Sequence, residues 1–318
     1  MTELLRVEGL TKDFTAIAGK TRIRAIDGVS LTLAYGETLG VVGESGCGKS
    51  TLGRTILRLI EPTAGDITFD GVDLRALDAA ALRAKRREMQ MIFQDPYASL
   101  DPRMTVGAIV AEPLVIHGIG DRESRRRTVR ELCETVGLEA DALTRYPHEF
   151  SGGQRQRIGI ARAIALAPKL IIADEPVSAL DVSIQSQILN LLVELRQRLG
   201  LSYIFISHDL AVIEHVSDTV TVMYLGRIVE TAAAEVLFAR PSHPYTEALI
   251  SAVPQTDPGQ RVARVALAGE MPNPESPPPG CPFRPRCPKA MDVCRTTPPA
   301  ETDIGTDGRP HLIHCHLY

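Results

Sequence analysis

The stretch that decides the fold of this chain reads Gly43-Glu44-Ser45-Gly46-Cys47-Gly48-Lys49-Ser50-Thr51. The apolar run 38–42 before it predicts a short buried strand, and residues 52–59 after it have the pattern of a helix. In such a setting a G-x-x-x-x-G-K-S/T loop curls its backbone N–H groups around phosphate oxygens, and the helix N-terminus adds its positive dipole end. The stretch therefore predicts a nucleoside-triphosphate site, in which Lys49 reaches the β- and γ-phosphates and Ser50 ligates Mg²⁺. A plain glycine-rich turn, the alternative, leaves the flanking strand and helix unexplained.

The composition is that of an ordinary globular protein. The chain has 318 residues, 44% of them hydrophobic, so it has room for one large or two medium domains. A net charge of −4 gives no electrostatic reason to expect nucleic acid. Basic clusters at 83–87 and 122–127 predict solvated helix faces, with membrane or partner contacts as the alternative. No apolar run reaches the ~18 residues of a membrane span, and the N-terminus lacks a signal-peptide core. We therefore expect a cytosolic protein, or one docked on the cytosolic face of a membrane.

Polar side chains that suit phosphate chemistry follow three further apolar runs. Gln94 ends one run, Asp174 and Glu175 follow a second, and His208 follows a third; the runs are residues 89–93, 169–173 and 201–207. Continuous apolar runs are typical of central strands in a parallel sheet, and ligands of such sheets bind beyond the carboxyl ends of the strands. We therefore expect these side chains to converge on the Gly43 loop.

Convergence gives each of these side chains a role in hydrolysis. Asp174 would hold Mg²⁺, directly or through its water, and Glu175 would orient or deprotonate a water in line with the γ-phosphate. His208 would hydrogen-bond the γ-phosphate and hold that water, while Gln94 would sense Mg²⁺ and the attacking water. A lone Gln or His at a strand end is more often structural, and it is the joint pattern with Lys49 that favours catalysis.

The segments around these runs predict a second sheet and a helical insert. Residues 4–10 and 25–33 alternate as half-exposed strands do. Phe14 lies between them and is either an edge or core residue or a side chain that stacks on adenine. From about 95 to 145, prolines and the helical periodicity of Arg125–Val136 predict a helical insert in an α/β core.

A second glycine loop precedes another predicted helix. The sequence reads Phe150-Ser151-Gly152-Gly153-Gln154-Arg155-Gln156-Arg157, followed by a helical pattern over 158–166. Ser151 is a good N-cap, and Gly152 and Gly153 expose backbone N–H groups at a helix start, which makes a second anion cradle. Taken alone, this segment is also compatible with an ordinary capped helix.

The chain from about residue 4 to 235 resembles the nucleotide-binding subunits of ATP-binding cassette transporters. The motifs that carry the resemblance are, in order, Ser151-Gly152-Gly153-Gln154, Leu170-Ile171-Ile172-Ala173-Asp174-Glu175-Pro176, Ser178-Ala179-Leu180-Asp181 and His208. One small departure is Phe150, where the family usually has Leu.

This resemblance implies an α/β fold of the P-loop NTPase (RecA-like) type, with an antiparallel β subdomain and a helical subdomain at about 95–165, inside a nucleotide-binding domain of residues 1–240. It also implies a head-to-tail dimer, in which the Gly43 loop of one subunit and the Ser151 loop of the other enclose one ATP. Phe14 matches the family's adenine-stacking aromatic. The implied nucleotide contacts are Phe14, Gly43, Glu44, Ser45, Gly46, Cys47, Gly48, Lys49, Ser50, Thr51, Gln94, Asp174, Ser151, Gly152, Gly153 and Gln154. The implied Mg²⁺ contacts are Ser50, Gln94 and Asp174, and the implied catalytic residues are Lys49, Gln94, Glu175 and His208.

Other stretches resemble the ATPase subunits of bacterial dipeptide and oligopeptide importers. These are residues 47–54, 95–103 and 145–148, and the C-terminal signature Ser242-His243-Pro244-Tyr245-Thr246-Glu247-Ala248-Leu249. The match is to the second of the two paired ATPases. It implies a related ATPase subunit or a second copy as partner, two integral-membrane permeases contacted by the segment after Gln94, and an extracytoplasmic solute-binding protein. No nucleic acid is expected as a partner. The protein would then lie at the cytoplasmic face of the inner membrane as a peripheral subunit.

Four of the six cysteines fall in the last 38 residues, within a predicted C-terminal extension of residues 241–318. Such a cluster in a reducing compartment is more often a metal site than disulfides. Cys281, Cys287, Cys294 and Cys315 are separated by five, six and twenty residues, a spacing that leaves iron–sulfur, zinc and unligated thiols open. In the importers that the chain resembles, this pattern is associated with a 4Fe–4S cluster. The neighbouring His311, His314 and His316 are expected to be bystanders.

Two other functions compete with the importer ATPase. A soluble cassette ATPase that acts as an ATP-driven clamp on ribosomes or DNA usually carries two cassettes or a long coiled-coil insertion, and this chain has neither. A cluster-sensing regulator would bind ATP and scarcely hydrolyse it.

Overall fold

The computed structural model describes residues 2–15, 22–252, 269–306 and 308–318. These residues form two compact units. Unit 1 comprises Ala34–Glu37 and Ala76–Phe205, together with Thr2; unit 2 comprises Glu3–Leu33, Thr38–Arg75 and Ile206–Tyr318.

Unit 1 is a small parallel sheet with a group of helices. Its elements are α2 (Ala79–Lys85), β6 (Met89–Ile92), α3 (Val106–Ile116), α4 (Arg122–Thr135), η1 (Ala140–Thr144), η2 (Pro147–Glu149), α5 (Gly152–Ile164), β7 (Leu170–Asp174), α6 (Val182–Leu199) and most of β8 (Ser202–Ile206). The strand order is β8-β7-β6, and β6 and β7 pair in parallel with Ile92 opposite Ala173. Every residue of β7 and β8 is buried, which confirms the prediction that these apolar runs are central strands.

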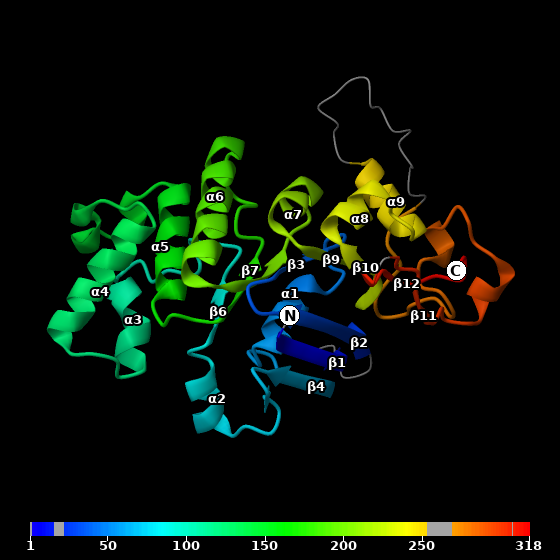
Figure 1. Cartoon of the computed structure of the whole chain (residues 1–318), viewed down its shortest axis with the longest axis horizontal. Coiled ribbons are helices and arrows are strands. Elements are labelled where there is room, and N and C mark those ends of the chain that lie inside the picture. The colour runs from blue at the N-terminus through cyan, green and yellow to red at the C-terminus, as the bar shows by residue number, and fades with distance from the viewer. Residues whose placement is uncertain (1, 16–21, 253–268, 307) are drawn as a thin grey trace. The chain divides into compact units, whose positions relative to one another are not determined.

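The predicted helical insert consists of α3, α4 and α5, which pack against one another (Figure 1). α4 begins three residues before the predicted start at Arg125 because Asp121 and Ser124 form a capping box, in which each side chain bonds the other's backbone N–H. α6 is amphipathic and buries Ile188, Leu191, Leu192 and Leu195 at helical spacing.

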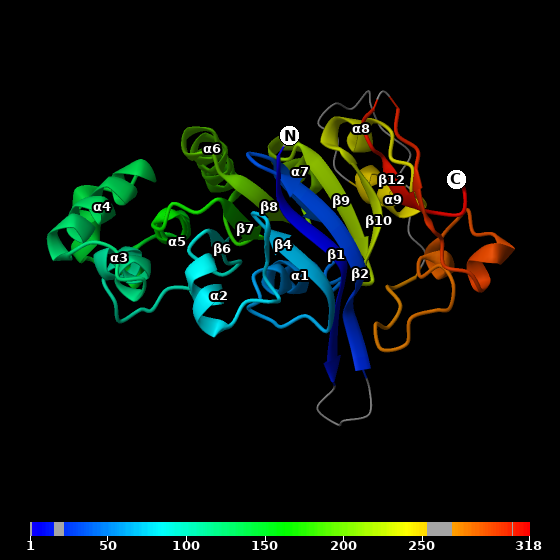
Figure 2. The ribbon, with the colours of Figure 1, turned by 60° about the horizontal axis from the view of Figure 1, so that its bottom comes forward.

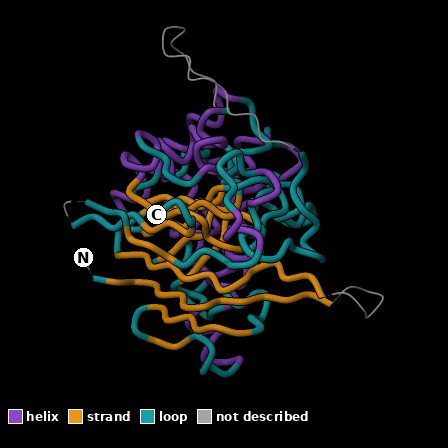
Figure 3. Tube along the Cα trace, turned by 90° about the vertical axis from the view of Figure 1, so that its right-hand side faces the viewer, coloured by secondary structure: helices purple, strands orange, loops and turns teal. Residues whose placement is uncertain are grey.

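Unit 2 contains the phosphate-loop segment and the C-terminal part of the chain. Its elements are β1 (Glu3–Thr15), β2 (Arg22–Ala34), β3 (Thr38–Val42), α1 (Lys49–Ile56), β4 (Ala64–Phe69), β5 (Val72–Asp73), α7 (Leu210–Val216), β9 (Thr219–Tyr224), β10 (Arg227–Ala233), α8 (Ala234–Ala239), α9 (Pro244–Ser251), η4 (Arg284–Arg286), η5 (Asp292–Arg295), β11 (Glu301–Asp303) and β12 (Leu312–His314). Figure 3 shows the strands in orange.

One sheet of unit 2 has the order β2-β1-β4-β5 and corresponds to the predicted antiparallel subdomain. β1 and β4 pair antiparallel, with Leu5 opposite Phe69, and Figure 2 shows β1, β2 and β4 side by side. β1 continues to Thr15, beyond the predicted strand of residues 4–10, so Phe14 belongs to this strand.

The other strands of unit 2 have the order β11-β12-β10-β9-β3. β3 pairs with β9 in parallel, and β9 and β10 form an antiparallel hairpin, in which Tyr224 lies opposite Arg227. The C-terminal tail adds β12 to the free edge of β10, with Ile313 opposite Glu230. The sequence did not predict this addition, because β11 and β12 have only three residues each.

A buried aromatic cluster fastens the C-terminal extension to the sheet. Tyr224 of β9, Tyr245 of α9 and Phe283 have ring centroids 4.8 to 5.4 Å apart, and all three side chains are almost fully buried. The edge-to-face and tilted contacts are those that aromatic quadrupoles favour. None of the helices in the described ranges is long and apolar enough to cross a membrane.

Candidate nucleotide site

The stretch Gly43–Thr51 leads from β3 into α1, as predicted, but the helix begins at Lys49 and not at residue 52. The Lys49 ammonium donates hydrogen bonds to the carbonyl oxygens of Gly43 at 2.7 Å and Glu44 at 3.0 Å, and its side chain is buried. The loop therefore wraps around the end of Lys49, and this contact fixes the loop and the ammonium relative to each other. Burial raises the pKa of the Cys47 thiol next to Lys49, so this cysteine is a neutral packing residue.

Two glycines of the loop occupy positions that no other residue can take without rearrangement. Gly43 has φ +150°, and a Cβ atom there would lie 2.2 Å from the carbonyl oxygen of Met223. Gly48 has φ +109°, and a Cβ atom there would lie 2.2 Å from the carbonyl oxygen of Ala25. Both contacts are to backbone, which cannot move aside as a flexible side chain can. The glycine spacing that identified the loop is thus required by its packing.

Glu44 of this loop contacts the C-terminal extension, which the sequence did not predict. Its carboxylate accepts hydrogen bonds from both terminal nitrogens of Arg286, at 2.6 and 2.9 Å. Its backbone N–H donates to the Tyr245 hydroxyl at 2.9 Å. Two residues from separate parts of the extension therefore contact one residue of the loop.

His208 follows β8, and the residue before it contacts β3, the strand that precedes the Gly43 loop. The backbone N–H of Ser207 donates to the carbonyl oxygen of Val41 at 3.2 Å, two residues before Gly43. His208 is exposed and precedes α7, whose N-cap is Asp209. Phe14 is 37% exposed on β1, with the Lys12 ammonium 5.0 Å from its ring centroid.

Unit 1 brings together the residues predicted at the ends of β6 and β7. The side-chain amide of Gln94 donates to a carboxylate oxygen of Glu175 at 2.9 Å. Asp174 ends β7 fully buried. Glu175 follows it with φ +46°, a conformation that costs free energy for a residue other than glycine and is concentrated at functional sites. The carbonyl oxygen of Glu175 accepts from the Ser178 hydroxyl at 3.1 Å, which fixes the short loop before α6.

The second glycine loop is the N-terminus of α5. Ser151 is the N-cap and forms a capping box with Gln154, as the prediction of an N-cap at Ser151 required. Gly153 packs so closely on α6 that a Cβ atom would lie 2.4 Å from Ile184 Cγ2. Ser151 and Gln154 are exposed, Gly152 is half-buried and Gly153 is buried, so only part of the first turn of α5 lies at the surface. Phe150, the departure from the family pattern, is buried beneath the guanidinium group of Arg145.

The four C-terminal cysteines line one small cavity with His243, Phe283 and Lys289 among its other walls. All four are free thiols, and burial raises the pKa of Cys281, Cys287 and Cys315. The backbone N–H groups of residues 283, 284, 289 and 317 act in the opposite direction and lower the pKa of these thiols. Within the residues described, no group of three or more His, Cys, Asp or Glu side chains is arranged to hold a metal ion. The iron–sulfur cluster stays a prediction.

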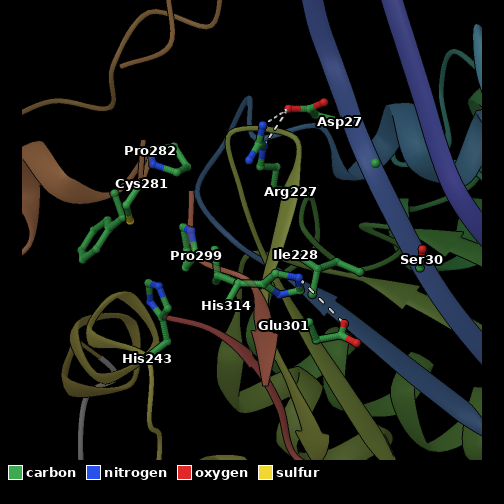
Figure 4. Close-up of a pocket in the computed structure, with 13 residues that line it drawn as sticks. Asp27, Ser30, Arg227, Ile228, His243, Cys281, Pro282, Pro299, Glu301 and His314 are labelled. Carbon is green, nitrogen blue, oxygen red and sulfur yellow. Dashed lines mark hydrogen bonds and ion pairs between the residues drawn. The ribbon is translucent and has the colours of Figure 1, made fainter. Parts of the chain in front are cut away.

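A larger cavity of unit 2 lies beside the cysteines and is separate from the phosphate loop. Figure 4 shows its wall, which includes Cys281, Arg227 and His314 but no residue of Gly43–Thr51. Arg227 Nε is 2.6 Å from a carboxylate oxygen of Asp27, and His314 Nε2 is 3.8 Å from one of Glu301. The ion pair between Arg227 and Asp27 joins β10 to β2, whereas burial lowers the pKa of His314, which lies on β12 opposite Glu301 of β11.

A parallel strand, a glycine loop closed around a lysine and a helix that starts at that lysine together define a P-loop nucleotide-binding protein. Two family descriptions match the chain: "ABC transporter" over residues 26–178 and "Oligopeptide/dipeptide transporter, C-terminal region" over residues 229–294.

Similar proteins extend over nearly the whole chain. A putative peptide import ATP-binding protein of Brucella ovis is 58% identical over 303 residues, which is 95% of each chain. The dipeptide transport ATP-binding protein DppF of Haemophilus influenzae is 49% identical over 318 residues, covering 99% of this chain and 96% of DppF. Among solved structures, a dimeric ATP-binding cassette in a post-hydrolysis state bound to ADP and Pi matches with a TM-score of 0.67 and 30% identity, covering 73% of this chain and 99% of that one. The chain therefore belongs to the ABC transporter ATPases, in the branch that carries the oligopeptide/dipeptide transporter C-terminal region.

Sequence reasoning identified the residues of the loops and strand ends but missed Arg286 and Tyr245. Tyr245 is part of the C-terminal signature quoted above and Arg286 directly precedes Cys287, and neither was given a role. The available signal was Glu44 itself, because an acid in a loop that binds anions needs a cationic partner nearby.

Proposed function

We propose that this protein hydrolyses ATP to drive the import of dipeptides or oligopeptides through membrane permeases. The observation that carries the proposal is the presence of both family regions on one chain, together with 58% identity over 95% of a relative named as a peptide import ATP-binding protein. Residues 1–240 are assigned to the ATP-binding cassette and residues 241–318 to the extension.

Hydrolysis would depend on positioning and on neutralising charge at the γ-phosphate. Lys49 and the N–H groups of Gly43–Thr51 would bind the β- and γ-phosphates, and Phe14 would stack on adenine. Glu175 would accept a proton from the attacking water, with its carboxylate oriented by Gln94, and His208 would hold the γ-phosphate. The hydrogen bond between Gln94 and Glu175 supports this pairing of roles. Ser50, Asp174 and Gln94 would hold Mg²⁺, whose positive charge offsets the charge of the triphosphate.

A second protomer would complete the site. The first turn of α5, in which Ser151 and Gln154 are exposed beside Gly152 and Gly153, suits an anion presented by another subunit, and the solved cassette of similar fold is a dimer. The partner would be a related ATPase subunit or a second copy of this chain. Two permeases would contact the segment after Gln94, where Tyr97 is 66% exposed. An extracytoplasmic binding protein would deliver the peptide, so the ATPase would work as a peripheral subunit at the cytoplasmic face of the membrane.

The cysteine cavity is assigned to a 4Fe–4S cluster held by Cys281, Cys287, Cys294 and Cys315. Four thiols that line one cavity are the donor set of such a cluster. In a cluster each thiolate binds a different iron, so the sulfurs need not be as close together as around a single ion. An absorption spectrum and an iron and sulfide assay of anaerobically purified protein test this assignment.

Peptide uptake by cells tests the proposed function. In a strain from which the gene is deleted, the wild-type gene is expected to restore uptake of a radiolabelled dipeptide or oligopeptide. The gene for the Lys49→Ala variant is expected to give no more uptake than the deletion strain alone. Unchanged uptake in the deletion strain, together with co-purification with ribosomes in place of permeases, would favour the soluble clamp. ATP binding without measurable turnover in the assembled transporter would favour the regulator.

A further inference from the structure

The phosphate loop contains an acidic side chain at a position where a free negative charge would oppose its ligand. Glu44 directly follows Gly43, and its carboxylate is 30% exposed. Carboxylate and triphosphate repel each other, so a loop that binds phosphate needs this charge to be neutralised or turned aside. Arg286 does both, because its guanidinium group binds both carboxylate oxygens.

The Arg286–Glu44 pair is better defined than a surface salt bridge. The two nitrogen–oxygen distances are 2.6 and 2.9 Å, and the Arg286 side chain is only 6% exposed. Hydrogen bonding to Glu44 raises the pKa of the Arg286 guanidinium. A bidentate, desolvated pair of this kind fixes direction as well as distance, whereas an exposed pair at the same distance is mobile and screened.

Tyr245 holds the backbone of the same residue. Its hydroxyl oxygen accepts the Glu44 N–H at 2.9 Å, and its side chain is fully buried. Burial raises the pKa of this hydroxyl, so it stays neutral. The two contacts come from α9 and from η4, which are 201 and 242 residues away from Glu44 along the chain. Side chain and backbone of Glu44 are thus held from two directions.

Both groups are themselves held in place. The ring of Tyr245 packs between Tyr224 and Phe283, and Phe283 is the residue that precedes η4. Arg286 ends η4 and is followed by Cys287, while Cys281 begins the same segment and donates its N–H to the carbonyl oxygen of Cys294. The position of Arg286 therefore depends on the folded cysteine segment.

We propose that Arg286 and Tyr245 are positioning residues for the phosphate loop, through which the C-terminal extension sets the affinity of the protein for ATP. This inference rests on the proposed assignment of Gly43–Thr51 as the phosphate loop. When the cysteine segment is folded, the charge of Glu44 is neutralised and the loop is held; when the segment is disrupted, that charge faces the triphosphate.

Binding of a fluorescent ATP analogue and steady-state ATP hydrolysis by the full-length protein test the proposal. Arg286→Gln is expected to weaken ATP binding and raise the KM for ATP about tenfold, as removal of one partner from a desolvated charge pair does, while kcat changes less than about threefold. Arg286→Lys keeps the charge without the bidentate geometry and is expected to recover part of the affinity. Glu44→Gln combined with Arg286→Gln removes both charges and is expected to recover most of it.

Arg309→Gln is the matched control. It removes another ion pair of the same extension, between Arg309 and Glu235, which involves no residue of the phosphate loop or of the cysteine cavity. Its ATP affinity is expected to equal that of the wild type. Thermal melting and circular dichroism of each variant report whether it folds.

Wild-type affinity in Arg286→Gln overturns the proposal, and so does a double variant that binds ATP no better than Arg286→Gln. Should Arg286→Gln fail to fold, Arg286→Lys decides in its place. The proposal expects Arg286→Lys to bind ATP more weakly than the wild type, because the bidentate contact that holds Glu44 is lost, and wild-type affinity in this variant refutes it. Lys49→Ala distinguishes a failure of the phosphate-loop assignment from a failure of the role proposed for the extension. Normal ATP binding in Lys49→Ala refutes the phosphate-loop assignment. If Lys49→Ala loses ATP binding but Arg286→Gln binds ATP normally, only the role of the extension is refuted.

Discussion

Acidification is predicted to loosen α9 through His243. This side chain is buried, and its Nδ1 accepts the backbone N–H of Tyr245 at 3.0 Å, so it caps the helix that carries Tyr245. A protonated ring cannot accept that bond. Burial lowers the pKa of His243 to about 4 from its ordinary 6.5; the nearby Glu230 carboxylate opposes the shift and His314 adds to it.

The size of the effect follows from these two values. In the opened helix the ring binds a proton as the pH falls below about 6.5, but in the folded helix it does so only near 4. Stability is therefore fully present above pH 6.5 and is lost as the pH falls toward 4. Between about pH 7.5 and 5, linkage gives a loss of about 2 kcal/mol in the free energy of opening α9.

Amide hydrogen exchange of α9 measures this free energy in the intact protein. The comparison is with His243→Asn, because Asn also accepts a hydrogen bond as an N-cap and does not titrate. We expect the difference in opening free energy between the two proteins to change by about 2 kcal/mol over this pH range. A difference that stays constant with pH would refute the reasoning, since both proteins would then be responding to other groups.

Two further substitutions test the packing that positions the site. Phe283→Ala removes a buried ring that contacts Tyr224 and Tyr245 and is expected to cost about 3 to 5 kcal/mol of the free energy of unfolding, measured with denaturant, with a smaller loss in Phe283→Leu. Gly48→Ala places a methyl group against the backbone of Ala25 and is expected to abolish binding of a fluorescent ATP analogue. Gly159→Ala has open space around its Cβ within α5 and is expected to bind ATP normally; equal loss in both variants would contradict the packing argument.

Local patterns were sufficient to predict the central strands and the loops. β3, β7 and β8 are short apolar runs buried on every residue, and the predicted and observed bounds differ by no more than about one residue. The glycine spacing of the phosphate loop reflects close backbone approach at Gly43 and Gly48, which is a local requirement and leaves a local signal.

Contacts between distant segments could not be predicted in the same way. The Glu230 carboxylate is fully buried and accepts hydrogen bonds from the backbone N–H groups of Ser242 and His243, and it lies 2.7 Å from His311 Nε2. Burial raises the pKa of Glu230, but these hydrogen bonds outweigh burial and leave it below its ordinary value. In the sequence Glu230 is one acid at the end of a hairpin, and nothing periodic links it to a histidine 81 positions later. The same holds for Glu44 and Arg286.

The rate of ATP hydrolysis by Glu175→Gln tests the ATPase assignment most directly. Gln94 already bonds the carboxylate at this position, and the amide has nearly the same size, so ATP binding is expected to persist. Loss of a general base is expected to reduce hydrolysis at saturating ATP by a factor of about 100 or more. Hydrolysis at the wild-type rate in this variant would contradict the role of Glu175 and, with it, the proposed mechanism.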